Sequence, residues 1–489
     1  MTTKIRPLLV LEINEVPWKV IDRFSKLPQL KNIQKFFASS KNLTTLTVDS
    51  GELSPWVTWP SFYRGMSNHD HGIKNLGQDV NTFRGKPLWE EYRDRGLSIG
   101  ICGTLQSWPA RDPGPAGFYI PDTFAHDEKC YPSFLEPLQR FNLRQVQENG
   151  RVLNSKIPLQ KEVFQLLKSI LKTGITAKTY WQIIRQLISE RFDRHRLARR
   201  PIFQGILFWD VFKNLYSKKV IPEFASFFTN HVASIMHRYW DHFFPEDFPN
   251  KVQSGPLFHS ETMIYALEVV DKIFSDAMEF QQKHPDLIIA VATSMGQDAV
   301  HRDEYNGYSA AIVDSAKFLK SFGASENDFK VNLAMVPQVS FEIRNGGLRR
   351  EMKRLIEAST ATDGSTLFKV DEVGISLTIT IETPSVNAIQ SGRLRIKSTQ
   401  SFIELKWQDA GIQMYAVEAG TAYHTPEGIL AFRGEGISAD NSRARLKASA
   451  VKDYLMEMVG LVEVNSEMPL LQSRREPLFE NQPAPDTAY

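Results

Sequence analysis

The sequence predicts an α/β fold, a three-layer α/β/α core built on a mostly parallel sheet. Short apolar runs of strand length at 8–13 and 286–293 alternate with segments of helical periodicity, such as 261–284. Buried parallel strands have nearly continuous apolar sequences, and alternating strands and helices are typical of parallel sheets. The 489 residues are 42% hydrophobic with a formal net charge of +2, which supports a large core and excludes a disordered chain.

Local signals define the first elements of this core. The strand at 8–13 is followed by a helical pattern over 17–37, which Pro28 divides into two shorter helices because proline interrupts helical hydrogen bonding. A further helix is predicted over 87–96, since its pattern ends at a glycine, and a strand over 97–102 follows it.

Two segments interrupt the alternation, and we interpret both as insertions into one core. Residues 150–220 are helical and basic, whereas 320–418 have an α+β pattern with a helix near 348–357. The strands predicted in the second insertion are 373–381, 393–396, 402–407 and 413–417. The core then comprises 1–149, 221–319 and 419–463, and a loose proline-rich tail occupies 464–489.

The basic stretch 185–200 (RQLISERFDRHRLARR) has two interpretations. It can bind phosphate or an anionic surface, or it can be the solvated side of a helix. In the second case the apolar side of the helix consists of Ile184, Leu187, Ile188 and Leu197. The second interpretation is preferred, because runs of charge are usually solvated.

Composition excludes several classes of protein. Two cysteines are too few for a disulfide scaffold or a thiolate zinc site. The 58 basic and 56 acidic residues leave no overall positive field, so no nucleic-acid partner is expected. No apolar run approaches the roughly 20 residues that span a bilayer, and no export signal is evident. We therefore expect no transmembrane segment and a cytoplasmic location.

Four segments carry a resemblance to one superfamily. In order, they are VLEINEVPW at 10–18, LSPWVTWPSFYRGMSNHDHGI at 53–73, IIAVATSMGQ at 288–297 and GTAYHTPEGILAFRGEGI at 420–437. Together they resemble the alkaline phosphatase superfamily, most closely its type I phosphodiesterase/nucleotide pyrophosphatase-like branch. The resemblance covers about 1–110 and 220–461, and it implies an alkaline phosphatase-like core.

The resemblance implies a pair of zinc-like cations held by Asp and His ligands at the carboxyl ends of parallel strands. This sequence departs from that pattern. The Asp expected after the first strand falls on Asn14, and a later Asp-His pair falls on Ser294 and Met295. Glu12 and Glu15 lie nearby, but neither occupies the ligand position unless a bulge shifts the chain. The motifs therefore predict one site for zinc or another divalent cation rather than two, or none.

The remaining predicted ligands are three histidines and the weak oxygen ligand Asn14. His237 and His424 match ligand positions of the family, and His231 lies where it could replace a missing Asp. Three imidazoles can hold one zinc ion with an open fourth position. The alternative is structural: His237 packs in the core and His231 caps a helix.

The position of the nucleophile in the family falls on Pro55, so two neighbouring hydroxyls compete for the role. Ser54 fits after a one-residue shift, and Thr58 belongs to a TWPS sequence similar to one in nucleotide pyrophosphatases. The alternative is that both residues only cap the following helix. The His-Asp-His sequence at 69–71 is expected to be mainly structural.

These observations favour a divergent hydrolase that acts on a phosphate ester or phosphodiester, and a sulfate ester is the less favoured substrate. Ser54 or an activated water would attack the ester. Its partner would be a small phosphorylated substrate. The alternative is a pseudoenzyme or an assembly factor, for example in surface-polysaccharide biosynthesis, that binds a phosphorylated ligand or a protein without turnover. The sequence does not predict an oligomeric state.

Overall fold

A computed structural model describes residues 4–149, 173–217, 219–249, 258–301, 308–332, 334–335, 338–382, 384–397, 402–416 and 420–462. It confirms the α/β class, with a central eight-stranded sheet that is parallel except at β18. From one edge to the other, the strands are β19 (Asp440–Lys447), β2 (Lys41–Leu46), β18 (Glu427–Arg433), β6 (Ile288–Ala292), β1 (Leu8–Ile13), β5 (Phe224–Thr229), β3 (Ile99–Cys102) and β4 (Phe118–Ile120).

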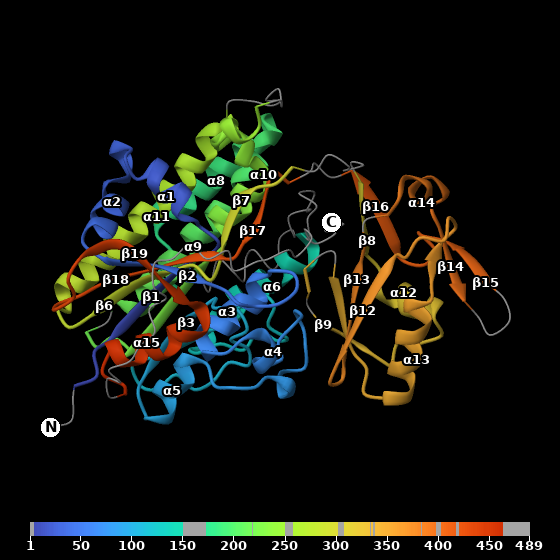
Figure 1. Ribbon diagram of the computed structural model, residues 1–489, viewed down its shortest axis with the longest axis horizontal. Coiled ribbons are helices and arrows are strands. Elements are labelled where there is room, and N and C mark those ends of the chain that lie inside the picture. Colours follow the sequence, from blue (N-terminus) through green and yellow to red (C-terminus); the bar gives the residue numbers. More distant parts are fainter. Residues whose placement is uncertain are drawn as a thin grey trace.

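Helices cover both faces of this sheet and form the predicted three layers (Figure 1). One face is covered by α1 (Trp18–Phe24), α2 (Lys31–Ala38), α9 (Arg200–Tyr216), α10 (His231–Phe243) and α11 (Phe258–Lys283). The other is covered by α3 (Pro55–Arg64), α5 (Leu88–Asp94) and α15 (Val451–Met458). Strand β1 is buried on both sides. Leu9 and Leu11 pack on the face covered by α10 and α11, whereas Leu8 and Val10 pack on the face covered by α3 and α5.

The local predictions for the core hold. Pro28 separates α1 from α2 and starts the short 3-10 helix η1 (Pro28–Leu30). Helix α5 is followed by Gly96, whose φ of +71° suits a glycine after a helix, and then by β3. The predicted helix and strand before residue 294 are α11 and β6.

The helical insertion corrects one prediction. The described helices within the predicted insertion are α8 (Ala177–Phe192), η4 (Arg194–Arg199) and α9, and α9 packs in the core on the central sheet. Residues 150–172 lie outside the described residues. Ile184 and Ile188 were expected on the buried side of α8, but they are 45% and 54% exposed. The buried side consists of Thr179, Gln186 and Glu190, because α8 contacts η4 and α9 through hydrogen bonds and an ion pair.

The α+β insertion projects to one side of the core (right in Figure 1). This region begins before the predicted boundary at 320, because β8 pairs with β16. Its elements are β8 (Tyr308–Ile312), α12 (Ser315–Ser321), β9 (Lys330–Asn332), β10 (Gln338–Glu342), α13 (Gly346–Glu357), β11 (Thr360–Ala361), β12 (Phe368–Val373), β13 (Ser376–Ile381), α14 (Val386–Ser391), β14 (Arg393–Lys397), β15 (Phe402–Lys406) and β16 (Ile412–Ala416). They form three small sheets, β12-β13-β10-β9, β11-β14-β15 and β16-β8. The single strand predicted over 373–381 is wrong, because Gly374 takes a φ of +61° and turns the chain between β12 and β13.

The remaining described elements lie between those named above. They are α4 (Asn68–His71), η2 (Val80–Thr82), η3 (Ser133–Leu135), α6 (Glu136–Asn149), η5 (Pro245–Asp247), β7 (Gly296–Ala299), β17 (Ala422–Thr425) and η6 (Ala448–Ala450). None of the helices in the described ranges combines the length and apolarity needed to cross a bilayer. The tail predicted over 464–489 lies outside the described residues.

Candidate metal centre

Polar side chains gather where three neighbouring parallel strands end. Asn14 and Glu15 follow β1, Asn230 follows β5, and Ser294 lies after β6. The carboxyl ends of parallel strands meet at one edge of the sheet, which is where open α/β folds place their sites. The order of the strands therefore brings together residues that are far apart in the sequence.

Glu15, His237 and His424 form a compact group at this edge. Glu15 Oε2 lies 3.0 Å from His237 Nε2 and 3.4 Å from His424 Nε2, and the potential ligand atoms all lie within 4.8 Å of one another. Bonds of about 2.1 Å in tetrahedral geometry separate the ligand atoms of a zinc ion by about 3.4 Å. The three side chains are therefore spaced as ligands of one cation would be.

Glu15 enters the site from an unusual backbone conformation. Its φ is +61°, in the left-handed region that non-glycine residues seldom adopt, and its side chain is 2% exposed. Asn14 Nδ2 donates to Glu15 Oε1 at 2.7 Å, and Gln297 Nε2 donates to Glu15 Oε2. Gln297 Nε2 also donates to the Ala233 carbonyl at 3.2 Å. Both carboxylate oxygens are thus held by amide groups that are themselves anchored.

The two histidines are oriented in the same way. His237 Nδ1 donates to the carbonyl oxygen of Ala422 at 3.0 Å, and His424 Nδ1 donates to that of Leu53 at 2.7 Å. These bonds leave the Nε2 atom of each ring directed at Glu15. Histidine ligands of metals usually have this arrangement, with the second nitrogen donating to a carbonyl or carboxylate. The donor set therefore fits a divalent cation such as zinc.

The opposite charges of Glu15 and the neighbouring histidines stabilise each other. Burial by itself would raise the pKa of Glu15, yet His424 and His237 hold it well below its ordinary value. Burial by itself would lower the pKa of His424, yet the Glu15 carboxylate and the Leu53 carbonyl raise it. Glu15 is consequently an ionised carboxylate in a buried place, and the two imidazoles beside it stabilise its charge.

Two of the four predicted ligands, His231 and Asn14, have other hydrogen-bond partners and do not face the two remaining histidines. His231 is apart from the group, since its Nε2 donates to the Ala266 carbonyl at 3.1 Å and its Nδ1 accepts from Thr229 Oγ1 at 2.6 Å. This is the arrangement of a satisfied core histidine. Its burial lowers the pKa of the ring to about 4, so it is neutral.

Asn14 supports Glu15 instead of facing the two histidines. Its amide oxygen accepts from Trp59 Nε1 at 2.8 Å, and its amide nitrogen donates to Glu15 and to Asn230 Oδ1 at 2.7 Å. The structure therefore brings together His237 and His424 of the predicted set, and it adds Glu15.

The two predicted hydroxyl groups differ in their surroundings. Ser54 is the residue before α3, but its side chain does not cap that helix, and it is 5% exposed. It directly follows Leu53, whose carbonyl orients His424. Thr58 is fully buried, and its Oγ1 lies 2.7 Å from Ser294 Oγ. Ser54 thus follows a residue whose backbone contacts His424, whereas the Thr58 hydroxyl is engaged with Ser294.

Uncharged residues occupy the two positions at which the family pattern expects a second pair of metal ligands. Ser294 and Met295 are both fully buried, and neither offers a charge. The His-Asp-His sequence does not contribute either. His69 is 91% exposed beside Asp70, whereas His71 is buried and hydrogen-bonded to Ser61. Among the residues that the structure describes, the Glu15 group is the cluster of three acidic or imidazole side chains spaced closely enough to hold a metal ion.

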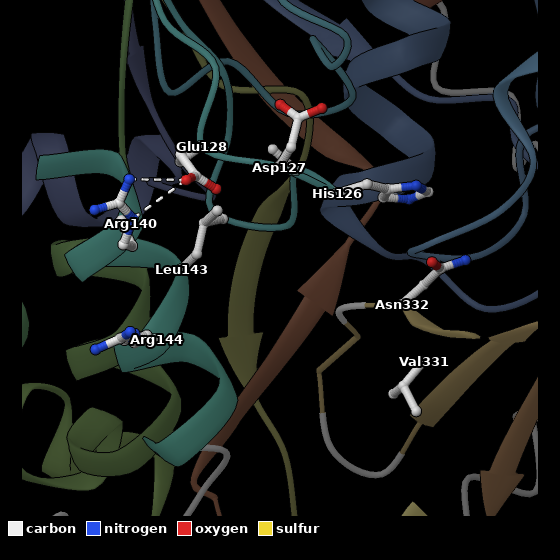
Figure 2. Close-up of a pocket in the computed structure, with 9 residues that line it drawn as sticks. His126, Asp127, Glu128, Arg140, Leu143, Arg144, Val331 and Asn332 are labelled. Atoms are coloured by element: carbon white, nitrogen blue, oxygen red, sulfur yellow. Dashed lines mark hydrogen bonds and ion pairs between the residues drawn. The ribbon is translucent and has the colours of Figure 1, made fainter. Parts of the chain in front are cut away.

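A separate cavity of about 300 Å³ lies between the core and the α+β insertion (Figure 2). Its lining residues are Ala125, His126, Asp127, Glu128, Arg140, Leu143, Arg144, Val331 and Asn332. Arg140 is paired with Glu128 at 2.8 Å, so its charge is already balanced. None of the predicted site residues lines this cavity, and the candidate chemistry stays with the Glu15 group.

The sequence placed Glu15 near the site but outside the predicted ligands, and it gave no role to Gln297. Glu15 follows a buried strand directly, which is a usable signal, but the family position falls on Asn14. Only the left-handed turn at Glu15 brings its carboxylate to His237 and His424. Gln297 had no sequence signal, because its role depends on the pairing of β7 with β17, which sets it opposite His424.

No family profile matches the chain, and no curated protein matches its sequence. The structure is similar to murine ectonucleotide pyrophosphatase/phosphodiesterase 5, at 8% identity and a TM-score of 0.40, over 94% of this chain and 96% of that one. It is also similar to phosphonoacetate hydrolase from Sinorhizobium meliloti 1021, at 10% identity and a TM-score of 0.43, over 93% and 96%. The chemistry of this chain rests on its own residues.

Proposed function

We propose that this chain is a divergent phosphoester hydrolase that holds one divalent cation between Glu15, His237 and His424. The observation that carries the proposal is the convergence of these three side chains, with each imidazole oriented by a backbone carbonyl. A bound cation would supply Lewis-acid stabilisation of the charge that grows on phosphoryl oxygens. Asn14 and Gln297 hold the carboxylate in place for this role.

Ser54 is the preferred nucleophile. It lies at the N-terminus of the ten-residue helix α3, where the partial positive charge of the helix favours a phosphate group. Its oxygen would bond to phosphorus while the ester oxygen leaves with a proton, and water would then release the phosphate from the serine. If water attacks the substrate directly, Ser54 positions the phosphate instead.

Metal analysis of the purified protein, combined with turnover assays, tests this proposal. Aryl phosphate, aryl phosphodiester and aryl sulfate are the substrates to compare. We expect one equivalent of zinc or manganese, its loss in His424→Ala, and phosphoester turnover that Ser54→Ala lowers. His69→Ala is the matched control, since His69 is exposed and outside the group. A protein that binds no metal and hydrolyses none of these esters contradicts the proposal.

A second candidate is a protein that binds a phosphorylated ligand without turnover. The observation in its favour is the uncharged pair formed by Thr58 and Ser294, beside Met295, where a two-metal enzyme needs carboxylate and imidazole ligands. This candidate predicts stoichiometric metal and measurable binding of a phosphate ester, but no hydrolysis. The same assays therefore separate the two functions.

A further inference from the structure

Helix α8 presents an apolar stripe to solvent. Trp181, Ile184, Ile188 and Phe192 are 69%, 45%, 54% and 87% exposed. They are spaced by three or four residues, so they lie on one side of the helix. Monomeric soluble proteins rarely expose a continuous apolar surface of this kind unless it is an interaction site.

On the side of α8 opposite the stripe, the fully buried residues are polar and contact the rest of the protein. Gln186 donates to Glu190 Oε1 at 2.8 Å and to the Arg196 carbonyl at 2.7 Å. Glu190 forms an ion pair with Arg200 at 2.8 Å, and Thr179 donates to Asp210 at 2.6 Å. These contacts fix the orientation of the helix and keep its apolar side outward.

Basic side chains flank the stripe. Lys178, Arg185, Arg191 and Arg194 are exposed, and none of the four pairs with an acidic group in the part of the chain that the structure describes. The acidic residues of this stretch are already engaged, Glu190 with Arg200 and Asp193 with Arg196. The stripe is consequently surrounded by unbalanced positive charge.

We propose that this side of α8 is a docking surface for an anionic lipid membrane. Amphipathic helices that lie in the membrane interface combine Trp, Phe and aliphatic residues on one side with flanking Lys and Arg. The apolar side chains would enter the headgroup region while the cations meet anionic lipids. Face-to-face docking of a second copy is disfavoured, because it would bring two identical sets of cations together.

The surface belongs to the helical layer that also carries a ligand of the candidate metal centre. Helix α8 packs on α9, and α9 packs on α10, which carries His237 (Figure 1). The proposal does not depend on hydrolysis, because lipid binding is measured without turnover.

Flotation of the full chain with vesicles tests the proposal. We expect the protein to float with mixed phosphatidylcholine and phosphatidylglycerol vesicles, but hardly with phosphatidylcholine alone, and high salt should weaken the binding. Replacing both Trp181 and Phe192 with glutamine should lower partitioning at least about tenfold, since most of the inserted apolar area is lost. Replacing both Arg185 and Arg191 with glutamine should remove most of the preference for anionic vesicles.

A matched control exists on the other side of the molecule. Phe402 and Ile403 in β15 are 58% and 51% exposed, so their double replacement by glutamine is the same kind of change on a surface without a role in docking. This control should float like the unmodified protein. The proposal fails if the unmodified protein does not bind anionic vesicles or if the Trp181→Gln, Phe192→Gln variant binds them equally well. It also fails if sedimentation shows a dimer that this variant abolishes, because a second copy would then cover the surface.

Discussion

Replacing Glu15 with glutamine tests the candidate metal centre most directly. The change preserves the shape of the side chain but removes the single carboxylate, whose Oε2 lies 3.0 Å and 3.4 Å from the two imidazole Nε2 atoms. Loss of a supporting group outside the ligand set usually costs about ten- to a hundredfold in metal affinity. Loss of a charged ligand should cost at least about a hundredfold, or about 2.8 kcal/mol at 1.4 kcal/mol per factor of ten.

Titration of metal-free protein with zinc, in competition with a chromophoric chelator, measures this loss. Glu15→Gln should bind at least about a hundredfold more weakly than the unmodified protein, and Gln297→Ala, which removes only a support, about ten- to a hundredfold more weakly. His69→Gln should bind zinc normally, since His69 is exposed away from the group. Equal zinc affinity in the unmodified protein and Glu15→Gln would refute the assignment of the ligands.

Three further predictions concern buried polar groups. Burial lowers the pKa of His71 to about 4 from 6.5, and Ile73 N–H donates to its Nδ1. The unfolded chain therefore takes up more protons below pH 6.5, and the contribution of His71 to stability should fall by about 2 kcal/mol between pH 7 and pH 5. Urea unfolding of His71→Gln should show a smaller fall, and an unchanged pH profile would contradict this. Burial raises the pKa of Glu12 to about 8 from 4.5, so its contribution to stability declines as the pH rises from 4.5 to 8. Glu12→Gln should be about 3 kcal/mol more stable than the unmodified protein at pH 7, as measured by thermal and urea unfolding, and a destabilised variant would oppose this reasoning. Thr58→Val leaves the Ser294 hydroxyl unpaired and should cost about 1–3 kcal/mol, and adding Ser294→Ala should recover part of that loss. Zinc affinity should stay unchanged in both variants, and a large decrease would place Thr58 in the metal site.

Much of the core could be predicted because its signals are local. The apolar run of β1 and the break at Pro28 depend on neighbouring residues, and the structure has both where the sequence placed them. The hairpin at Gly374 was missed, since an alternating strand pattern continues through a turn that only a positive φ reveals. The prediction of the buried side of α8 was wrong, because apolar residues were assumed to face inward. Instead, hydrogen bonds of Gln186 and the ion pair of Glu190 anchor the helix.

The candidate site was predictable only in part, for a physical reason. His237 and His424 could be found because they belong to motifs with a recognisable order, and they converge because α10 packs against β17. His231 looked equally suitable, yet its two ring nitrogens are satisfied in the core by Thr229 and Ala266. Whether a histidine is a ligand or a packed side chain depends on these partners, which the sequence does not show.

The sequence by itself determined the α/β class and the buried strands, since these depend on residue type and periodicity. The tertiary structure decided which carboxylate completes the remaining group. Glu15 reaches His237 and His424 only because the chain turns in the left-handed region after β1. It stays there because its neighbour Asn14 and the distant Gln297 hold its two oxygens, and Asn14 is itself anchored by Trp59 and Asn230. A strained backbone conformation of this kind is maintained by surrounding contacts and not by local sequence.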